Sequence, residues 1–381
     1  MTVLHIDHRA QYYSIKDEID SAIKRVLEGG SYVMNKDVAN FEKEFAEYCG
    51  VKYGVSVQSG HDAILISLLA LGIGSGDEVI TVDNGCPSVP VAISHTDATP
   101  VFVDIDERTY NIDPARIEEA ITPRTKVILP IHSYGQPYDV RAVRQVAEEK
   151  GLLVMEDASI AAGARYKGQR VGAFGDVGVF SLSYGKILNA LGSAGMITTD
   201  RPDVARRAQF LREYGFRPLR DSDGIKDEYT TGDLVSAFQG YNSGLDAIQA
   251  AVLSVKLKVL DQWVELRGKK ARLYDRLLSE LDVIRPYIMD NVTSTYRGYV
   301  IRVKGRNNIL YCLHARGVLA RAIYLPPLHM HPLWRHLGYR EGDFPVTERV
   351  AREMISLPLY PELTDDQLGE VVQALEACVS A

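Results

Sequence analysis

The chain has 381 residues, of which 46% are hydrophobic and 24% charged, and its formal net charge is −7. This length can bury a large interior and favours two domains, and the composition is ordinary for a globular enzyme. Acidic and basic residues are interspersed, without the lysine and arginine stripe that binding along a phosphate backbone requires, so we do not expect a nucleic-acid partner.

No run approaches eighteen apolar residues, and the first residues lack the basic-then-apolar order of a signal peptide. We therefore expect a cytoplasmic protein without a membrane partner. The four cysteines are Cys49, Cys86, Cys312 and Cys378, and no CxxC pair occurs among them. This spacing argues against a disulfide framework and a structural zinc site, so four reduced thiols and no metal are expected.

Between about residues 50 and 200, short β-rich runs alternate with amphipathic stretches, which is the pattern of parallel strands joined by crossover helices. The expected strands are 78–82, 100–104, 126–130, 152–157, 177–183 and 195–199. The helices expected from apolar spacing are 61–73, 114–121 and 140–151. The predicted fold class is α/β, with a mostly parallel sheet flanked by helices.

After residue 243 the pattern changes. Residues 244–281 read as one long helix, followed by mixed strand and helix patterns at 299–303, 307–317 and 365–379. We predict a large cofactor-binding domain at residues 1–250, which includes an N-terminal helical segment. Residues 251–381 would then form a linking helix and a smaller α+β C-terminal domain.

Two opposite charges follow neighbouring predicted strands. Asp157 ends the apolar run LLVMED, and Lys186 follows the run VGVFSLS. Ligands of open α/β sheets collect at the carboxyl ends of strands, where a partly desolvated lysine has a lowered pKa and can form a Schiff base with an aldehyde. An aspartate could bond a protonated pyridine nitrogen there. The alternatives are a solvated Lys186, and an Asp157 that caps the next segment or pairs with Arg165.

A phosphate site is indicated at the start of the predicted helix 61–73. Ser59 and Gly60 precede that helix, whose free N–H groups suit an anion, and Ser181 could add a hydroxyl. The alternative is a plain N-cap. Tyr184 could relay protons or simply pack, and Cys86 lacks a visible base, which favours inert packing.

Taken in order, the motifs resemble the DegT/StrS family of pyridoxal-phosphate sugar aminotransferases over about residues 12–377. The motifs are SGHDA, GDEVIT, TPVFVDID, NIDP, ITPRTKVILPIHSYGQP, EDAS, GDVGVFSLSYGK, GYNSGLDAIQAAVL, PLH, DFPVTE and SLPLYPELT. The resemblance implies the aspartate-aminotransferase fold (fold type I) and pyridoxal 5′-phosphate as cofactor.

Site residues follow from the same resemblance. Lys186 would hold the cofactor covalently, Asp157 would bond its ring nitrogen, and Ser181 its phosphate. Asn242 would reach the phosphate of the other subunit, which implies a homodimer with shared active sites. His329 matches a position near the active site, where a substrate contact is expected.

Several cofactor contacts depart from the family pattern. His61, which follows Gly60, replaces a threonine, and Cys86 replaces an aromatic residue that stacks on the cofactor ring. Ile160 replaces a glutamine near the ring hydroxyl. Ala162 replaces a histidine, and Gly244 replaces an arginine. The lost stack is worth on the order of 1 kcal/mol. Either neighbouring residues replace the lost cofactor contacts and the protein is an unusual aminotransferase, or the pocket is reshaped for another pyridoxal-phosphate reaction.

The expected reaction moves an amino group from an amino acid, glutamate or glutamine, to a keto sugar, often nucleotide-linked in this family. Such a transaminase would serve amino-sugar and natural-product biosynthesis. One alternative is a non-transaminating pyridoxal-phosphate enzyme, namely a lyase, dehydratase or cyclase. Another is a family member that has lost catalysis.

Overall fold

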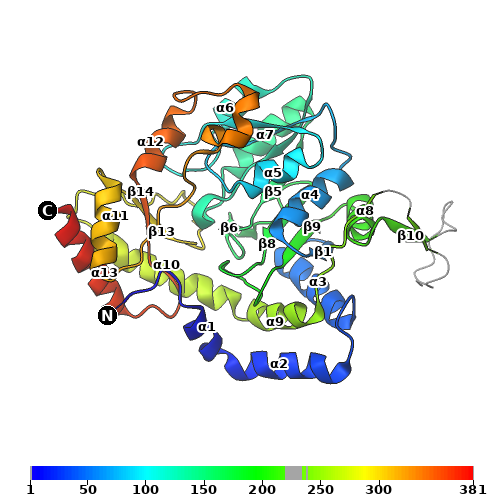
Figure 1. Cartoon of the computed structure of the whole chain (residues 1–381), viewed down its shortest axis with the longest axis horizontal. Helices are drawn as coiled ribbons and strands as arrows, with labels where there is room; N and C mark the ends of the chain where they lie inside the picture. Colours follow the sequence, from blue (N-terminus) through cyan, green and yellow to red (C-terminus); the bar gives the residue numbers. More distant parts are fainter. Residues whose placement is uncertain (1, 219–233, 237–238, 381) are drawn as a thin grey trace.

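A computed structural model describes residues 2–218, 234–236 and 239–380 (Figure 1). Its α-helices are α1 (His8–Ser14), α2 (Lys16–Gly29), α3 (Lys36–Cys49), α4 (Gly60–Ala70), α5 (Ser88–Ser94), α6 (Pro114–Ala120), α7 (Val140–Lys150), α8 (Pro202–Arg212), α9 (Ala247–Leu257), α10 (Leu260–Leu277), α11 (Arg306–Ala315), α12 (Pro345–Glu353) and α13 (Asp365–Val379). Short 3₁₀ turns are η1 (Ser133–Gly135), η2 (Leu328–Met330) and η3 (Pro332–Leu337).

The strands are β1 (Tyr53–Val57), β2 (Glu78–Val82), β3 (Thr99–Val103), β4 (Thr125–Leu129), β5 (Leu153–Asp157), β6 (Arg165–Tyr166), β7 (Gln169–Arg170), β8 (Val177–Ser181), β9 (Gly195–Thr199), β10 (Phe216–Pro218), β11 (Leu234–Ser236), β12 (Val292–Thr293), β13 (Tyr299–Arg302) and β14 (Met354–Leu357).

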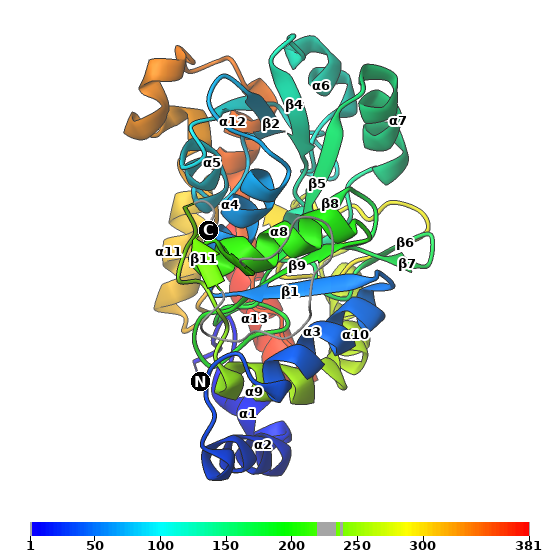
Figure 2. The same ribbon diagram turned by 90° about the vertical axis from the view of Figure 1, so that its right-hand side faces the viewer.

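A seven-stranded sheet with the order β1-β9-β8-β5-β4-β2-β3 forms the centre of the molecule. In this sheet β9 runs in the direction opposite to the other six strands, which run parallel to one another, so the prediction of a mostly parallel sheet is confirmed. All six predicted strands are present, whereas β1 was not predicted. In Figures 1 and 2, α4 and α8 lie on one side of β8, β9 and β1, and α3 and α9 lie on the other.

The central strands are apolar because helices cover both faces of the sheet. Every residue of β2 and β9 is buried, which explains their continuous rather than alternating hydrophobic pattern. The three helices predicted in this region are confirmed with shifted ends as α4, α6 and α7. As expected, α7 stops at Gly151, which takes a left-handed conformation at φ 66°.

The region predicted as one long helix contains two, because α9 and α10 are separated at Lys258 and Val259. No glycine or proline marks the break, so composition held no sign of it. Leu260 and Trp263 of α10 pack into the main core, whereas Ala271 and Tyr274 belong to a second core with β13, β14, α11 and α13. The proposed division into domains at residue 250 stays a prediction.

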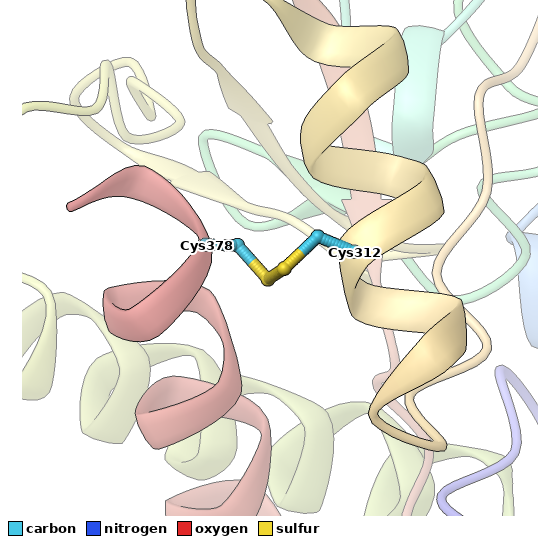
Figure 3. The surroundings of a disulfide bond; sticks show 2 residues. All are labelled: Cys312 and Cys378. Carbon is cyan, nitrogen blue, oxygen red and sulfur yellow. A yellow bond between two sulfur atoms is a disulfide. The ribbon is translucent and has the colours of Figure 1, made fainter. Parts of the chain in front are cut away.

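The expectation of four reduced thiols is wrong for one pair. Cys312 of α11 and Cys378 of α13 form a disulfide with an S–S distance of 2.05 Å and a Cα–Cα distance of 5.8 Å (Figure 3). The two helices pack side by side, although their cysteines are 66 residues apart and form no recognisable motif. Cys49 is a buried free thiol, and Cys86 is exposed.

Among the described residues, no helix combines the length and apolar character needed to cross a bilayer.

Candidate active site

A cavity of about 210 Å³ opens where β5 and β8 end and α4 begins. Its position agrees with the rule that ligands of open α/β sheets bind beyond the carboxyl ends of the strands. Seven of the ten predicted site residues line this cavity. They are Gly60, His61, Cys86, Asp157, Ile160, Ser181 and Lys186. The other lining residues are Ser59, Ile64, Ser88, Ile131, Ser159, Ser183 and Tyr324.

Asp157 is held rigidly at the end of β5. Its backbone N–H donates to the Pro130 carbonyl at 2.9 Å, and its carbonyl accepts from His132 N–H at 3.0 Å. Its Oδ1 accepts a 2.8 Å bond from the backbone N–H of Ser159, as the capping alternative predicted. Arg165 instead donates to the Gly168 carbonyl, so the predicted pairing with Asp157 is wrong. Among the described residues Oδ2 has no hydrogen-bond partner, which leaves one carboxylate oxygen for a ligand.

Lys186 is part of a tight turn that follows β8. Its backbone N–H donates to the Ser183 carbonyl at 3.1 Å, and Gly185 adopts φ 87°, which favours glycine. Burial lowers the pKa of Lys186. The negative charge of Asp157 raises this pKa, and the positive charge of Arg297 lowers it further. Lys186 is therefore not the solvated surface charge of the alternative reading, because its amine lines the cavity with an increased neutral fraction.

A second, fully buried lysine holds this turn in place. Asn189 donates through Nδ2 to the Lys186 carbonyl and to Gln11 Oε1 of α1, both at 3.0 Å. Nζ of Lys256, from α9, donates to both the backbone carbonyl and Oδ1 of Asn189 at 2.8 Å. Burial lowers the pKa of Lys256 to about 8, opposed by Glu362. The position of Lys186 thus depends on contacts from two distant helices.

The start of α4 can hold an anion. Ser59 caps the helix through a 3.1 Å bond from Asp62 N–H to its Oγ, so the N-cap alternative is correct for its side chain. A Cβ on Gly60 would lie 2.5 Å from Cβ of Ser181, so only glycine allows the helix to approach β8 this closely. This approach places the Ser181 hydroxyl beside the first-turn N–H groups and the positive end of the helix dipole.

Three of the five substituted residues, His61, Cys86 and Ile160, line the cavity, whereas Ala162 and Gly244 do not. His61 Nδ1 lies 3.2 Å from the Ser88 carbonyl, and His61 Nε2 lies 3.2 Å from His95 Nδ1. Both ring nitrogens are thereby engaged by the protein. The Ser88 hydroxyl also lies 3.1 Å from Cys86 Sγ. Cys86 and Ile160 present a thiol and an aliphatic side chain to the cavity where the family pattern has a ring and an amide.

Three predicted site residues do not line the cavity of their own chain. Tyr184 is 65% exposed and its ring packs on His8 at a centroid distance of 4.2 Å. His329 is buried beside Asp83, whose Oδ2 lies 2.7 Å from Nδ1, and although burial alone lowers the pKa of His329, this carboxylate raises it. Asn242 is exposed and pairs through its backbone with Glu213. Their substrate and cofactor roles stay predictions.

Tyr324 is a cavity residue that the sequence reasoning missed. It comes from the loop before η2 with a left-handed φ of 58°, a strained backbone of the kind that clusters at functional sites. Its ring packs on Tyr134 at a centroid distance of 5.8 Å, and burial raises its pKa. Its position five residues before His329, in YLPPLH, was the only available signal.

Comparisons with known proteins agree with this arrangement. The DegT/DnrJ/EryC1/StrS aminotransferase family matches residues 13–376. A "pleiotropic regulatory protein" of Geobacillus stearothermophilus is 38% identical over 98% of each chain. The dTDP-3-amino-3,4,6-trideoxy-alpha-D-glucose transaminase of Streptomyces venezuelae is 38% identical over 97% of this chain and 94% of its own. The crystal structure of S. venezuelae DesV with a ketimine intermediate superposes with a TM-score of 0.93 at 37% identity, covering 100% of this chain and 99% of that one.

Proposed function

The chain belongs to the DegT/DnrJ/EryC1/StrS aminotransferase family, and we propose that it transfers an amino group from L-glutamate or L-glutamine to a nucleotide-linked keto sugar. That it is an aminotransferase follows from its relatives. The observation that carries the proposal is one cavity lined by Lys186 and Asp157 together with Ser181 and the first residues of α4. A nucleotide-linked acceptor is supported by the dTDP-sugar transaminase that is 38% identical.

The cavity residues fit pyridoxal 5′-phosphate, the cofactor of this family. The free Oδ2 of Asp157 would accept the ring N–H. The Ser181 hydroxyl and the first-turn N–H groups at Gly60 and His61 would hold the phosphate, since the close packing of Gly60 on Ser181 leaves them on one side of the cavity. When bound, the cofactor supplies an aldehyde that receives the amino group and a ring that delocalises negative charge.

Lys186 and Asp157 would have different roles in the reaction. Lys186 Nζ, partly neutral because it is desolvated, would attach to the aldehyde and, once displaced by the donor amine, would carry the proton to and from the substrate carbon. Asp157 would keep the ring nitrogen protonated, which increases the ring's capacity to accept negative charge. The Asn189 and Lys256 contacts would keep Nζ positioned for this transfer.

We propose a homodimer with shared active sites. Asn242 is exposed and lies outside the cavity of its own chain, as expected if it completes the phosphate site of a second copy. A sedimentation measurement tests this arrangement, because a protein that stays monomeric with cofactor bound would contradict it.

The half-reaction with the donor tests the proposed function. Cofactor-loaded protein is mixed with L-glutamate alone, and the amine form of the cofactor and free 2-oxoglutarate are measured. We expect stoichiometric conversion without any sugar, and none in Lys186→Ala. If the loaded protein converts no amino acid, transamination is refuted, and a lyase, dehydratase or cyclase becomes the better assignment.

A further inference from the structure

Arg297 approaches the cavity from the segment that joins β12 to β13. Its backbone N–H donates to the Tyr134 carbonyl at 2.9 Å, beside the matching bond from Thr295 N–H to the Gly135 carbonyl. A Cβ on Gly185 would lie 3.9 Å from Nη2 of Arg297, so the guanidinium lies against the residue that precedes Lys186. The backbone of this segment thus fixes a cation directly beside the amine-bearing turn.

This guanidinium has no anionic partner among the described residues. Within the part of the chain that the structure describes, its Nε is buried without a hydrogen bond and its guanidinium forms no ion pair. Arg212 and Arg302 are buried with acidic partners, Glu42 for the first and Glu107 and Glu353 for the second. Two other buried arginines, Arg267 and Arg306, donate to backbone carbonyls instead, and in the described part of the chain their Nε atoms also lack a partner. Arg297 is half-buried, and it differs from Arg267 and Arg306 in its place, because its guanidinium borders the turn that carries Lys186. A largely desolvated cation without an acidic partner is stabilised when an anionic ligand binds to it.

Arg321 adds a positive charge near Arg297, and two neutral histidines lie close to it. Burial lowers its pKa, Tyr324 opposes that effect, and the charge of Arg321 adds to it. His5 and His8 are also close enough for the charge of Arg297 to lower their pKa, after the larger effect of burial on each. The Nδ1 atoms of both histidines are buried and lack hydrogen-bond partners. Arg297 therefore supplies the positive charge beside the turn of Lys186, and the two histidines offer ring nitrogens that no described group occupies.

We propose that Arg297 binds the α-carboxylate of the amino-acid donor. This inference rests on the proposed function, and the spacing of groups in an amino acid carries it. The amine and the carboxylate are attached to the same carbon, so a donor whose amine reaches Lys186 must place its carboxylate directly beside that lysine. The diphosphate of a nucleotide sugar is separated from the reacting carbon by the sugar ring, and so lies too far away to be the partner.

The first test compares donors in the half-reaction. Arg297→Gln is expected to raise the KM for L-glutamate, L-glutamine and L-alanine alike, by about 10- to 100-fold, because all three share the α-carboxylate and lose charge-assisted hydrogen bonds. L-isoglutamine carries an amide in that position, so its KM should change little. A loss confined to L-glutamate would mean that Arg297 binds the side-chain carboxylate, and would overturn the proposal.

Arg321→Gln is the matched control, since it removes a positive charge from the same neighbourhood on an exposed residue. It should leave each KM within about twofold, because exposed charges at a distance are screened. Arg297→Lys keeps the charge without the planar fork and should recover only part of the loss. Equal effects of Arg297→Gln and Arg321→Gln would show a general field rather than a binding contact, and would refute the assignment.

Binding without turnover gives a second readout. Glutarate, which has no amine and cannot react, is titrated calorimetrically into the cofactor-loaded protein. Its Kd should increase about 10- to 100-fold in Arg297→Gln and stay unchanged in Arg321→Gln. An unchanged Kd in Arg297→Gln overturns the inference even where the enzyme transaminates, whereas wild-type protein that transaminates no amino acid refutes the proposed function itself.

Discussion

Lys256 allows a quantitative prediction about stability, because it is a buried lysine whose ammonium group contacts carbonyl oxygens and no carboxylate. Only 2% of the residue is exposed, and its three acceptors are neutral oxygens of Asn189 and Gln11. Burial lowers its pKa from 10.5 to about 8. In the unfolded chain the same amine keeps its proton up to about pH 10.4.

The pH window follows from these two values. Below about pH 8 Lys256 is charged in both states, so it contributes no pH dependence. Between about pH 8 and pH 10.5 the unfolded chain holds the proton that the folded protein has released, so the free energy of unfolding rises with pH. The full pKa difference corresponds to about 3 kcal/mol at about 1.4 kcal/mol for each pH unit.

The assay is urea unfolding at a series of pH values from 7 to 10.5, for wild type, Lys256→Met and Lys258→Met. Lys258 is an exposed lysine directly after α9 and serves as the control. The difference in unfolding free energy between wild type and Lys256→Met should shift by about 3 kcal/mol in favour of wild type across the window. The difference for Lys258→Met should stay constant. A constant difference for Lys256→Met as well would refute this account of Lys256.

Three further predictions address other parts of the molecule. Burial, with a smaller effect of Arg297, lowers the pKa of His5 to about 3, so the free energy of unfolding should fall as the pH decreases from about 6.5 towards 3. In urea titrations over this pH range, His5→Gln should remove up to about 5 kcal/mol of that decrease. The same decrease in wild type and His5→Gln would contradict this. Cys312→Ser should lower the unfolding free energy by about 4 kcal/mol, because the disulfide no longer closes the loop in the unfolded chain. Dithiothreitol should lower the unfolding free energy of wild type by the same amount and leave that of Cys312→Ser unchanged. A wild-type protein whose stability does not respond to reduction would argue against the disulfide. Cys86→Phe restores a ring on the cavity wall and should tighten cofactor binding about fivefold in a cofactor titration, whereas unchanged affinity would mean that Tyr324 or another neighbour already compensates.

The parts of the fold that were predictable are those encoded in local pattern. The continuous apolar runs of β2, β5 and β8 and the glycine stop of α7 were visible because burial on both faces and left-handed backbone each leave a local trace. The missed strand β1 (YGVSV) has the same length as the predicted strands, but its first residue is exposed and the second half-buried, so it lacks a continuous apolar run. The break before α10 has no helix-breaking residue. Both the pairing of β1 with the sheet and the break between α9 and α10 are determined by tertiary packing.

The same distinction applies to the site. Asp157, Lys186 and Ser181 were found because each stands at a strand end. Arg297 and Tyr324 come from segments far away in sequence that fold back onto the large sheet, and the pairing of Cys312 with Cys378 depends on how α11 packs on α13. Contacts between segments far apart in sequence form only when the complete chain folds, so no local sequence motif predicts them.

The attachment point of the cofactor is the most direct test of the account. Protein incubated with pyridoxal 5′-phosphate is reduced with borohydride, digested and analysed by mass spectrometry. The modification is expected on Lys186 alone, because its desolvated amine lines the cavity that Asp157 shares. Modification of Lys256, the other buried lysine with a lowered pKa, or of no lysine at all would contradict it.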